Sequence, residues 1–126
     1  MFDATSEKKL IGVHPDLVRV LRAAVKTSPV PFKITEGVRD LARQKQLMKA
    51  GASQTLDSRH LTGHAADIVC VVAGVVRWDW SLYRIVAAHV KEVAAKLGIP
   101  IEWGGDWKKF PDGPHYQLPR KQYPAV

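Results

Sequence analysis

The sequence predicts a small α+β domain in which helices flank a largely antiparallel sheet. Three observations carry this prediction. The chain has 126 residues, a length typical of one domain. Helical and strand patterns alternate in the order α-β-α-β-β-α-β-β, and the segments between them are short except at 51–59 and 104–114. Residues 1–126 are therefore expected to form a single domain.

The first half of the chain predicts two helices with a strand between them. Pro15 opens a helix in which apolar residues follow the helical period, and the SPVP segment at 28–31 ends it. The segment FKITE at 32–36 alternates apolar and polar side chains, which is typical of a strand. A short helix is expected from Leu41 to Lys49, ending before Gly51.

The second half predicts a hairpin, a long helix and two short strands. From Ala65 the sequence is apolar and β-branched, and it is expected to turn near Ala73–Gly74. Asp79 or Ser81 caps the longest predicted helix, which runs to Leu97 with Gly98 just beyond it. The segments IPIEW (99–103) and HYQL (115–118) are expected to be strands on either side of a glycine-rich loop.

Composition and cysteine usage limit the class of protein. A hydrophobic content of 46% with 25% charged residues is ordinary for a globular domain. No apolar run approaches the ~20 residues that cross a bilayer, so no stable membrane insertion is expected. The N-terminus carries charged residues where a secretory signal has its apolar region, which predicts synthesis in the cytoplasm. The single cysteine, Cys70, excludes an internal disulfide and is expected in the core.

The formal charge of +7 favours a polyanionic partner such as nucleic acid, anionic lipid or an anionic cell wall. The basic residues are scattered along the chain, and no nucleic-acid-binding signature accompanies them. Nucleic acid is therefore not expected as the partner.

The segment SRHLTGHAADI, residues 58–68, contains two possible metal-ligand pairs. His60 and His64 would share a helix face, but the corresponding metalloprotease motif needs a glutamate where Leu61 stands, and Gly63 disfavours a helix. His60 and Asp67 can converge if the chain turns at Gly63 into a strand. The alternative, a salt-bridged aspartate beside a surface histidine, stays open on these residues alone.

A second cluster, DGPH at 112–115, strengthens the metal hypothesis. Two histidines and one aspartate would leave one zinc position open for water, as catalytic zinc requires. A carboxylate that lies nearby without binding the metal would serve as the base for that water.

These motifs resemble those of the VanY-like zinc D-Ala-D-Ala carboxypeptidase and L-alanyl-D-glutamate endopeptidase family. SRHLTGHAAD matches the signature S-x-H-x-x-G-x-A-x-D, DGPHYQL resembles the second element, and TEGVRDLARQ resembles an upstream G-x-R segment. The resemblance runs from about Val13 to Leu118 and is greatest to the single-domain phage endolysins of the family. It implies the small fold shared by Hedgehog-type domains and D-Ala-D-Ala peptidases.

The resemblance also implies a site. It implies one Zn²⁺ per chain, an acid/base carboxylate where many relatives carry glutamate, an arginine that contacts the substrate, and a serine at a fixed position of the signature, which could hydrogen-bond the substrate or orient the loop. The matching positions are His60, Asp67 and His115 for the zinc, then Asp112, Arg39 and Ser58. A surface salt bridge with Glu36 or Asp40 is the alternative for Arg39, and Glu102 is the rival to Asp112.

Four further residues have weaker claims to function. His14 and His89 are expected to be structural, whereas Trp103 and Trp107 flank the glycine-rich loop and are expected either in the core or in the wall of a cleft.

The expected function is zinc-dependent hydrolysis of the peptidoglycan stem peptide by a monomer, at the L-Ala–D-Glu bond. D-Ala-D-Ala carboxypeptidase activity is the alternative, and a catalytically idle zinc module or a basic nucleic-acid-binding domain are the alternatives from other classes. By analogy with phage lysins, the protein would be made in the host cytoplasm and reach the cell wall in the periplasm through a holin.

Overall fold

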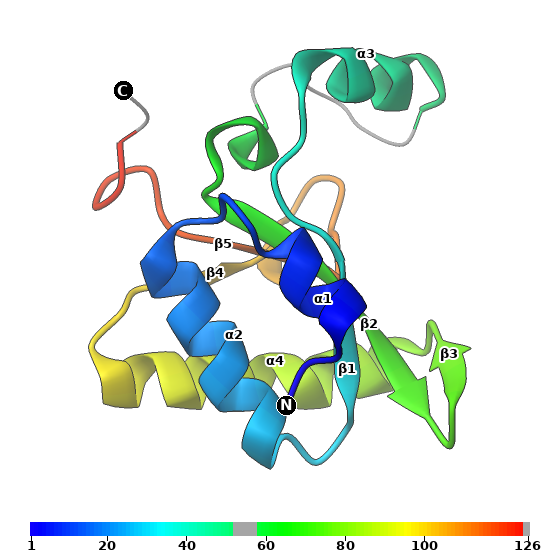
Figure 1. Ribbon diagram of the computed structural model, residues 1–126, viewed down its shortest axis with the longest axis vertical. Coiled ribbons are helices and arrows are strands. Elements are labelled where there is room, and N and C mark those ends of the chain that lie inside the picture. Colours follow the sequence, from blue (N-terminus) through cyan, green and yellow to red (C-terminus); the bar gives the residue numbers. More distant parts are fainter. Residues whose placement is uncertain (52–57, 125–126) are drawn as a thin grey trace.

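The computed structural model describes residues 1–51 and 58–124 (Figure 1). Within these residues the helices are α1 (Ala4–Lys9), α2 (Pro15–Thr27), α3 (Leu41–Lys49) and α4 (Trp80–Leu97). The strands are β1 (Phe32–Glu36), β2 (Ala65–Val72), β3 (Val75–Arg77), β4 (Glu102–Trp103) and β5 (His115–Gln117). Two 3₁₀ turns, η1 (Arg59–Thr62) and η2 (Gly104–Asp106), precede β2 and follow β4.

The strands form one antiparallel sheet with the order β1-β2-β5-β4, and β3 pairs with the far end of β2. The long strand β2 therefore lies at the centre of the sheet. Its N-terminal half pairs with β1 on one edge and with β5 on the other, and this half carries Asp67.

The core lies between the sheet and the packed helices α2 and α4 (Figure 1). The apolar face of α2 is fully buried at Leu17, Val20 and Leu21, as its helical period predicts. Cys70 is buried in the same core, and this burial raises the pKa of its thiol to about 11. Helix α3 lies at one end of the molecule, apart from α2 and α4 (Figure 1).

Most predicted elements are confirmed. Helices α2, α3 and α4, strand β1 and the hairpin turn at Ala73–Gly74 all have the expected bounds. Asp79, rather than Ser81, is the residue before α4, although its side chain bonds Arg77 and not the helix. Residues 52–57 of the predicted 51–59 loop lie outside the described residues.

Two expectations need correction. The strand expected at 99–103 is only Glu102–Trp103, because the backbone N–H of Ile99 bonds Ala94 in the C-terminal cap of α4. Helix α1 was not predicted, since its six residues are too few to show a helical period. Its first turn is held by Asp3, whose carboxylate accepts the N–H of Ser6 at 2.8 Å.

No helix among the described residues has the length and apolar character that crossing a membrane requires.

Candidate active site

The antiparallel register places Asp67 between two polar side chains of neighbouring strands. Asp67 of β2 faces His115 of β5 across one ladder and Glu36 of β1 across the other. Directly opposed residues have neighbouring side chains, so the sheet alone brings this row together.

A tight turn brings His60 to the same place. The turn η1 ends at Gly63, which adopts φ of +78°, a conformation that favours glycine. A Cβ at Gly63 would also lie 2.5 Å from the carbonyl oxygen of Gly12. The chain therefore turns at Gly63 as predicted, and the N–H of His60 is held by the hydroxyl oxygen of Ser58 at 3.2 Å.

The side chains of His60, Asp67 and His115 form a cluster that could hold a metal ion. Their candidate ligand atoms all lie within 4.8 Å of one another. His60 Nε2 is 3.2 Å and His115 Nδ1 is 3.1 Å from Asp67 Oδ1. A tetrahedral zinc site with ligand distances of about 2.1 Å has ligand–ligand edges of about 3.4 Å, so the spacing fits zinc.

The outer hydrogen bonds of the two rings indicate which nitrogens are available to a cation. His60 Nδ1 donates to the carbonyl oxygen of Gly37 at 2.8 Å, and His115 Nε2 donates to Gln117 Oε1 at 2.8 Å. When the rings are neutral, their remaining nitrogens present lone pairs toward a carboxylate. Three such acceptors stay together only with a proton or a metal ion among them, so the donor set suits a metal with nitrogen and oxygen ligands.

The electrostatics of the metal-free cluster agree with this. Burial alone would raise the pKa of Asp67, but hydrogen bonds with His115 and His60 hold it below its usual range. Burial likewise would lower the pKa of His115, yet the carboxylate of Asp67 raises it above the usual value. The cluster therefore favours a positive charge beside the carboxylate of Asp67.

His64 lies outside the cluster. Its Nδ1 is 2.7 Å from the hydroxyl of Thr62, and its ring lies 5.6 Å from that of His14. The helical His60–His64 pair is therefore not formed, because η1 ends before His64.

Asp112 lies beside the cluster without joining it. Its backbone N–H bonds the carbonyl oxygen of Gly104 at 2.9 Å, and its carbonyl accepts the N–H of His115 at 3.2 Å. A Cβ at Gly104 would lie 2.4 Å from the carbonyl oxygen of Asp112, so the close approach of these two segments requires glycine. Burial, followed by the negative charge of Asp67, raises the pKa of the Asp112 carboxyl group.

Arg39 is buried and its guanidinium is largely engaged. It makes a two-bond ion pair with Glu36, with Nε–Oε1 at 2.8 Å and Nη2–Oε2 at 2.7 Å, and Nη1 donates to Gln44 at 2.6 Å. Its Nη2 is 3.8 Å from Asp67 Oδ2. The salt bridge with Glu36 that was the alternative for Arg39 is therefore present, and it aims the same guanidinium at the ligand cluster.

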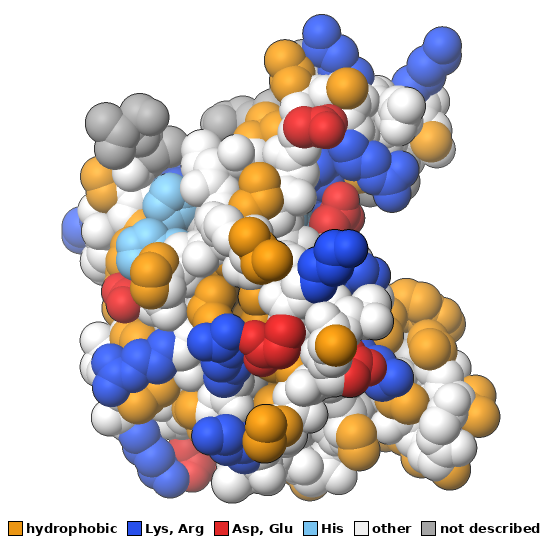
Figure 2. Space-filling model, viewed as in Figure 1, with side chains coloured by type: hydrophobic (Ala, Val, Ile, Leu, Met, Phe, Trp, Pro, Cys, Tyr) orange, Lys and Arg blue, Asp and Glu red, His pale blue; other side chains and the backbone are white. Residues whose placement is uncertain are grey.

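These groups line one cleft of about 860 Å³. Arg39, Ser58 and Asp112 share its wall with the three ligand residues, together with Lys109 and Arg120. Figure 2 shows the surface hollowed between α3 and the β2–β3 hairpin. All six residues proposed for the site from the sequence therefore meet in one place.

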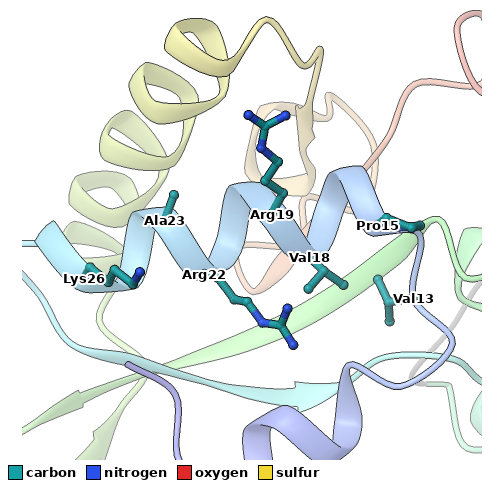
Figure 3. Close-up of a pocket in the computed structure, with 7 residues that line it drawn as sticks. All are labelled: Val13, Pro15, Val18, Arg19, Arg22, Ala23 and Lys26. Atoms are coloured by element: carbon teal, nitrogen blue, oxygen red, sulfur yellow. The ribbon is translucent and has the colours of Figure 1, made fainter.

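A second cavity, of about 510 Å³, runs along α2 (Figure 3). Its lining, all within the described residues, holds no histidine, cysteine or carboxylate: Val13, Pro15, Val18, Arg19, Arg22, Ala23 and Lys26. Figure 3 shows Arg19 and Arg22 extending in different directions from α2, and Arg22 pairs with Glu7. This cavity lacks the groups that catalysis would need.

Two residues that orient side chains of the site were not identified from the sequence. Glu36 and Gln117 were not assigned to the site, although Gln117 stands two residues after His115, on the same face of a strand. Glu102, the rival to Asp112, is not among the residues that line the cleft; it accepts the amide of Gln117 at 3.0 Å.

The other candidate residues fall into two groups. His14 caps α2, His89 bonds Thr27, and Trp103 lies in the core, so these three are structural. Trp107 lines the cleft, with its ring 5.0 Å from the ring of His115.

Comparisons with known proteins find relatives that are named as L-Ala–D-Glu peptidases. A chain of Serratia marcescens, the L-Ala D-Glu endopeptidase ChiX, superposes with a TM-score of 0.92 at 54% identity, over 99% of this chain and 95% of that one. The L-alanyl-D-glutamate peptidase of Escherichia phage T5 is 33% identical over 97% of this chain and 91% of its own length. The peptidoglycan L-alanyl-D-glutamate endopeptidase CwlK of Bacillus subtilis is 32% identical over 78% of this chain and 66% of its own.

A sequence model of one family spans nearly the whole chain. It describes the phage L-alanyl-D-glutamate peptidases and matches residues 1–122, a range that contains every residue of the cluster and its cleft. On that match, and on the likeness of both sequence and fold to named members, the chain belongs to the phage L-alanyl-D-glutamate peptidase family.

Proposed function

We propose that this protein is a zinc-dependent peptidoglycan peptidase that hydrolyses the L-Ala–D-Glu bond of the stem peptide. One observation carries the proposal: a cluster of two histidines and one aspartate lies beside a separate carboxylate in an open cleft, in a chain whose relatives bear the name of that activity. His60, Asp67 and His115 would hold one Zn²⁺, His60 through Nε2 and His115 through Nδ1.

The metal, when bound, would supply Lewis-acid activation of water and of the scissile carbonyl. Asp112 would accept the proton of the attacking water and deliver it to the leaving amine. Its raised pKa suits both steps, because the carboxyl group must take up a proton and release it again.

Cationic side chains of the cleft would position the substrate. Arg39, held by Glu36, would contact the carbonyl oxygen as it gains charge, and Ser58 would contact the peptide near His60. Lys109 and Arg120 line the same cleft. A stem peptide carries free carboxylates beyond the scissile bond, and this positive lining suits them.

The proposal is tested by incubating purified muropeptides with the protein, with and without a chelator, and identifying the products by mass spectrometry. We expect cleavage between L-Ala and D-Glu that stops when the metal is removed. Loss of the terminal D-Ala would instead identify a D-Ala-D-Ala carboxypeptidase. Zinc binding without any cleavage would identify an idle module, and salt-dependent DNA binding without cleavage a nucleic-acid-binding domain.

The ligand set has its own test. His60→Ala, Asp67→Ala and His115→Ala should each lose zinc, measured by metal analysis of the purified protein, whereas His64→Ala should retain about one equivalent. Loss of zinc from the His64 variant with retention in the Asp67 variant would refute the assignment.

The place of action is part of the proposal. We expect a monomer that is made in the host cytoplasm and reaches the cell wall by holin-type release. Cells that produce the protein should then lyse only after the inner membrane is permeabilised. Lysis of intact producing cells would contradict this route.

A further inference from the structure

Aromatic side chains extend the cleft beyond the metal-ligand cluster. Trp78, Trp107 and Phe110 all line it, with 64%, 36% and 65% of their surfaces exposed. Large aromatic rings contribute most to stability or binding when they are buried. A group of them exposed in one cleft therefore marks a surface that a ligand covers.

The ring of Trp78 is held in a defined orientation. It lies parallel to Tyr83, with ring centroids 6.2 Å apart and an interplanar angle of 6°. The Tyr83 hydroxyl donates to the carbonyl oxygen of Arg77 at 2.8 Å and accepts the N–H of Cys70 at 3.2 Å. One face of Trp78 thus rests on an anchored ring while much of its surface stays open, and such preorganisation lowers the entropy lost on binding.

Phe110 is presented to the cleft by a constrained loop. Its φ of +51° is uncommon for a bulky side chain, and no burial of its ring offsets this cost. The loop is held in place at Gly113, three residues after Phe110. The indole N–H of Trp103 donates to the carbonyl of Gly113 at 2.7 Å, and Gly113 packs against Trp80. Strained backbone that exposes an aromatic ring at a cleft is a feature of ligand-binding loops.

The aromatic surface reaches the ligand cluster, since the ring of Trp107 lies 5.0 Å from that of His115. In peptidoglycan the L-Ala residue is joined directly to the lactyl group of N-acetylmuramic acid. At about 3.5 Å per extended residue, the sugar therefore begins about 7 Å from the scissile bond. A substrate whose scissile bond lies at the His60–Asp67–His115 cluster would bring its sugar within reach of the walls of this cleft.

We propose that Trp78, Trp107 and Phe110 form a binding surface for the sugars of the glycan strand. The inference rests on the proposed function and adds that the enzyme also binds the sugars to which the stem peptide is attached. A pyranose ring presents C–H groups on its faces and hydroxyls at its rim, so it can cover exposed aromatic rings while its polar groups stay in water.

The two ends of the cleft differ in chemistry. Trp78 lies between β3 and α4, and the segment that follows β5 carries Arg120. These segments lie on opposite sides of the molecule (Figure 1). Lys109 adjoins Phe110, so the difference rests on the two extremes: the uncharged sugar suits the end at Trp78 and the carboxylates of the peptide suit the end at Arg120.

The test compares two substrates that share one scissile bond: a disaccharide tetrapeptide and the same tetrapeptide without sugars. The wild-type KM should be at least about tenfold lower for the sugar-bearing substrate, and Trp78→Ala or Phe110→Ala should remove most of this difference. Both variants should cleave the free tetrapeptide with unchanged kcat and KM. Ile85→Ala is the control, because Ile85 is exposed on α4 but does not line the cleft.

A binding experiment with peptide-free glycan strands separates this inference from the proposed function. Binding is detected by the quenching of tryptophan fluorescence. Quenching in the wild type that is lost in Phe110→Ala supports the sugar surface even if no peptide bond is cut. Equal KM values for both substrates, together with no glycan binding, would overturn it and leave the peptidase intact. A dimer that Trp78→Ala dissociates in sedimentation, or lipid-vesicle binding that it abolishes, would assign the surface to a second copy or to a membrane and would also overturn the inference.

Discussion

At the scale of single residues, the carboxyl group of Asp67 organises the site. One of its oxygens meets the rings of His60 and His115, and the other faces the guanidinium of Arg39 at 3.8 Å. An aspartate in the centre of a sheet is unfavourable unless such partners compensate for its desolvation. The same contacts direct two imidazole nitrogens toward one point, so the group that is costly to bury is also the one that assembles the candidate metal site.

The role of Asp112 predicts the outcome of removing its charge. Asp112→Asn has nearly the same shape, but an amide cannot accept a proton from water at neutral pH. We expect a folded protein that carries zinc and binds peptidoglycan, with cleavage reduced at least ~100-fold. Asp112→Glu should be the mildest replacement, since glutamate keeps a carboxylate that can accept the proton. Rates are measured on purified muropeptides.

Glu102→Gln is the matched control for that experiment, because Glu102 lies outside the lining of the cleft. Near wild-type cleavage by the Asp112 variant, combined with inactivity of the Glu102 variant, would move the base to Glu102. Loss of zinc from Asp112→Asn would make Asp112 a ligand.

Arg39 gives a second prediction at this scale. Lysine keeps the positive charge but loses the planar fork that bonds both Glu36 and Gln44. We expect Arg39→Lys to bind zinc like the wild type and to lower kcat by about tenfold or more, as is typical when an oriented donor to the oxyanion is displaced. Arg43→Lys, on an exposed neighbour whose guanidinium lies 3.8 Å from the carboxylate of Glu36, should have no such effect. Unchanged turnover in Arg39→Lys would show that the ion pair of Arg39 with Glu36 has a structural role alone.

At the scale of elements, the last strand supports the site by its alternation. His115 and Gln117 share one face of β5, and Gln117 links the ring of His115 to Glu102 of β4. Partners of this kind fix the protonated nitrogen of a ligand histidine. Gln117→Leu keeps the volume but removes the acceptor, so zinc affinity should fall about 10- to 100-fold in competition with a chromophoric chelator.

Glu102→Gln retains an oxygen for the amide of Gln117 and should bind zinc nearly as tightly as the wild type. Equal affinities for the wild type and Gln117→Leu would show that the ring of His115 is oriented by the fold alone.

An element or contact can be predicted from the sequence when the interactions that form it are between residues close together in the chain. Helices α2 and α4 have long periodic patterns and strand β2 is one apolar, β-branched run, so these elements were predicted. The three residues that could hold a metal lie in short motifs that resemble those of a known family, which is how they were proposed. Helix α1 depends on one cap and on packing against β1. The pairing of Glu36 with Arg39 near Asp67, and of Gln117 with Glu102, depends on strand register, which one sequence does not specify.

At the scale of the whole molecule, stability, pH and metal are linked through the cluster. The raised pKa of His115 means that its contribution to metal-free stability is full below its ordinary value of 6.5 and is lost as pH rises through the higher folded value. The lowered pKa of Asp67 means that its contribution is present above its ordinary value of 3.8 and is lost only as pH falls through the lower folded value. The metal-free protein is therefore favoured at mildly acidic pH.

Zinc has the opposite preference, because it binds neutral imidazoles and so competes with protons for His115. We therefore expect the increase in Tm on adding zinc to be larger at about pH 8 than at about pH 6, measured by thermal unfolding of matched chelated and zinc-loaded samples. His64→Ala should show the same larger zinc-dependent increase in Tm at the higher pH, since His64 does not belong to the cluster. His115→Ala should show little zinc stabilisation at either pH. A zinc-dependent increase that stays constant or shrinks toward alkaline pH would mean that no proton is displaced from the cluster between these pH values, and it would refute the raised pKa of His115.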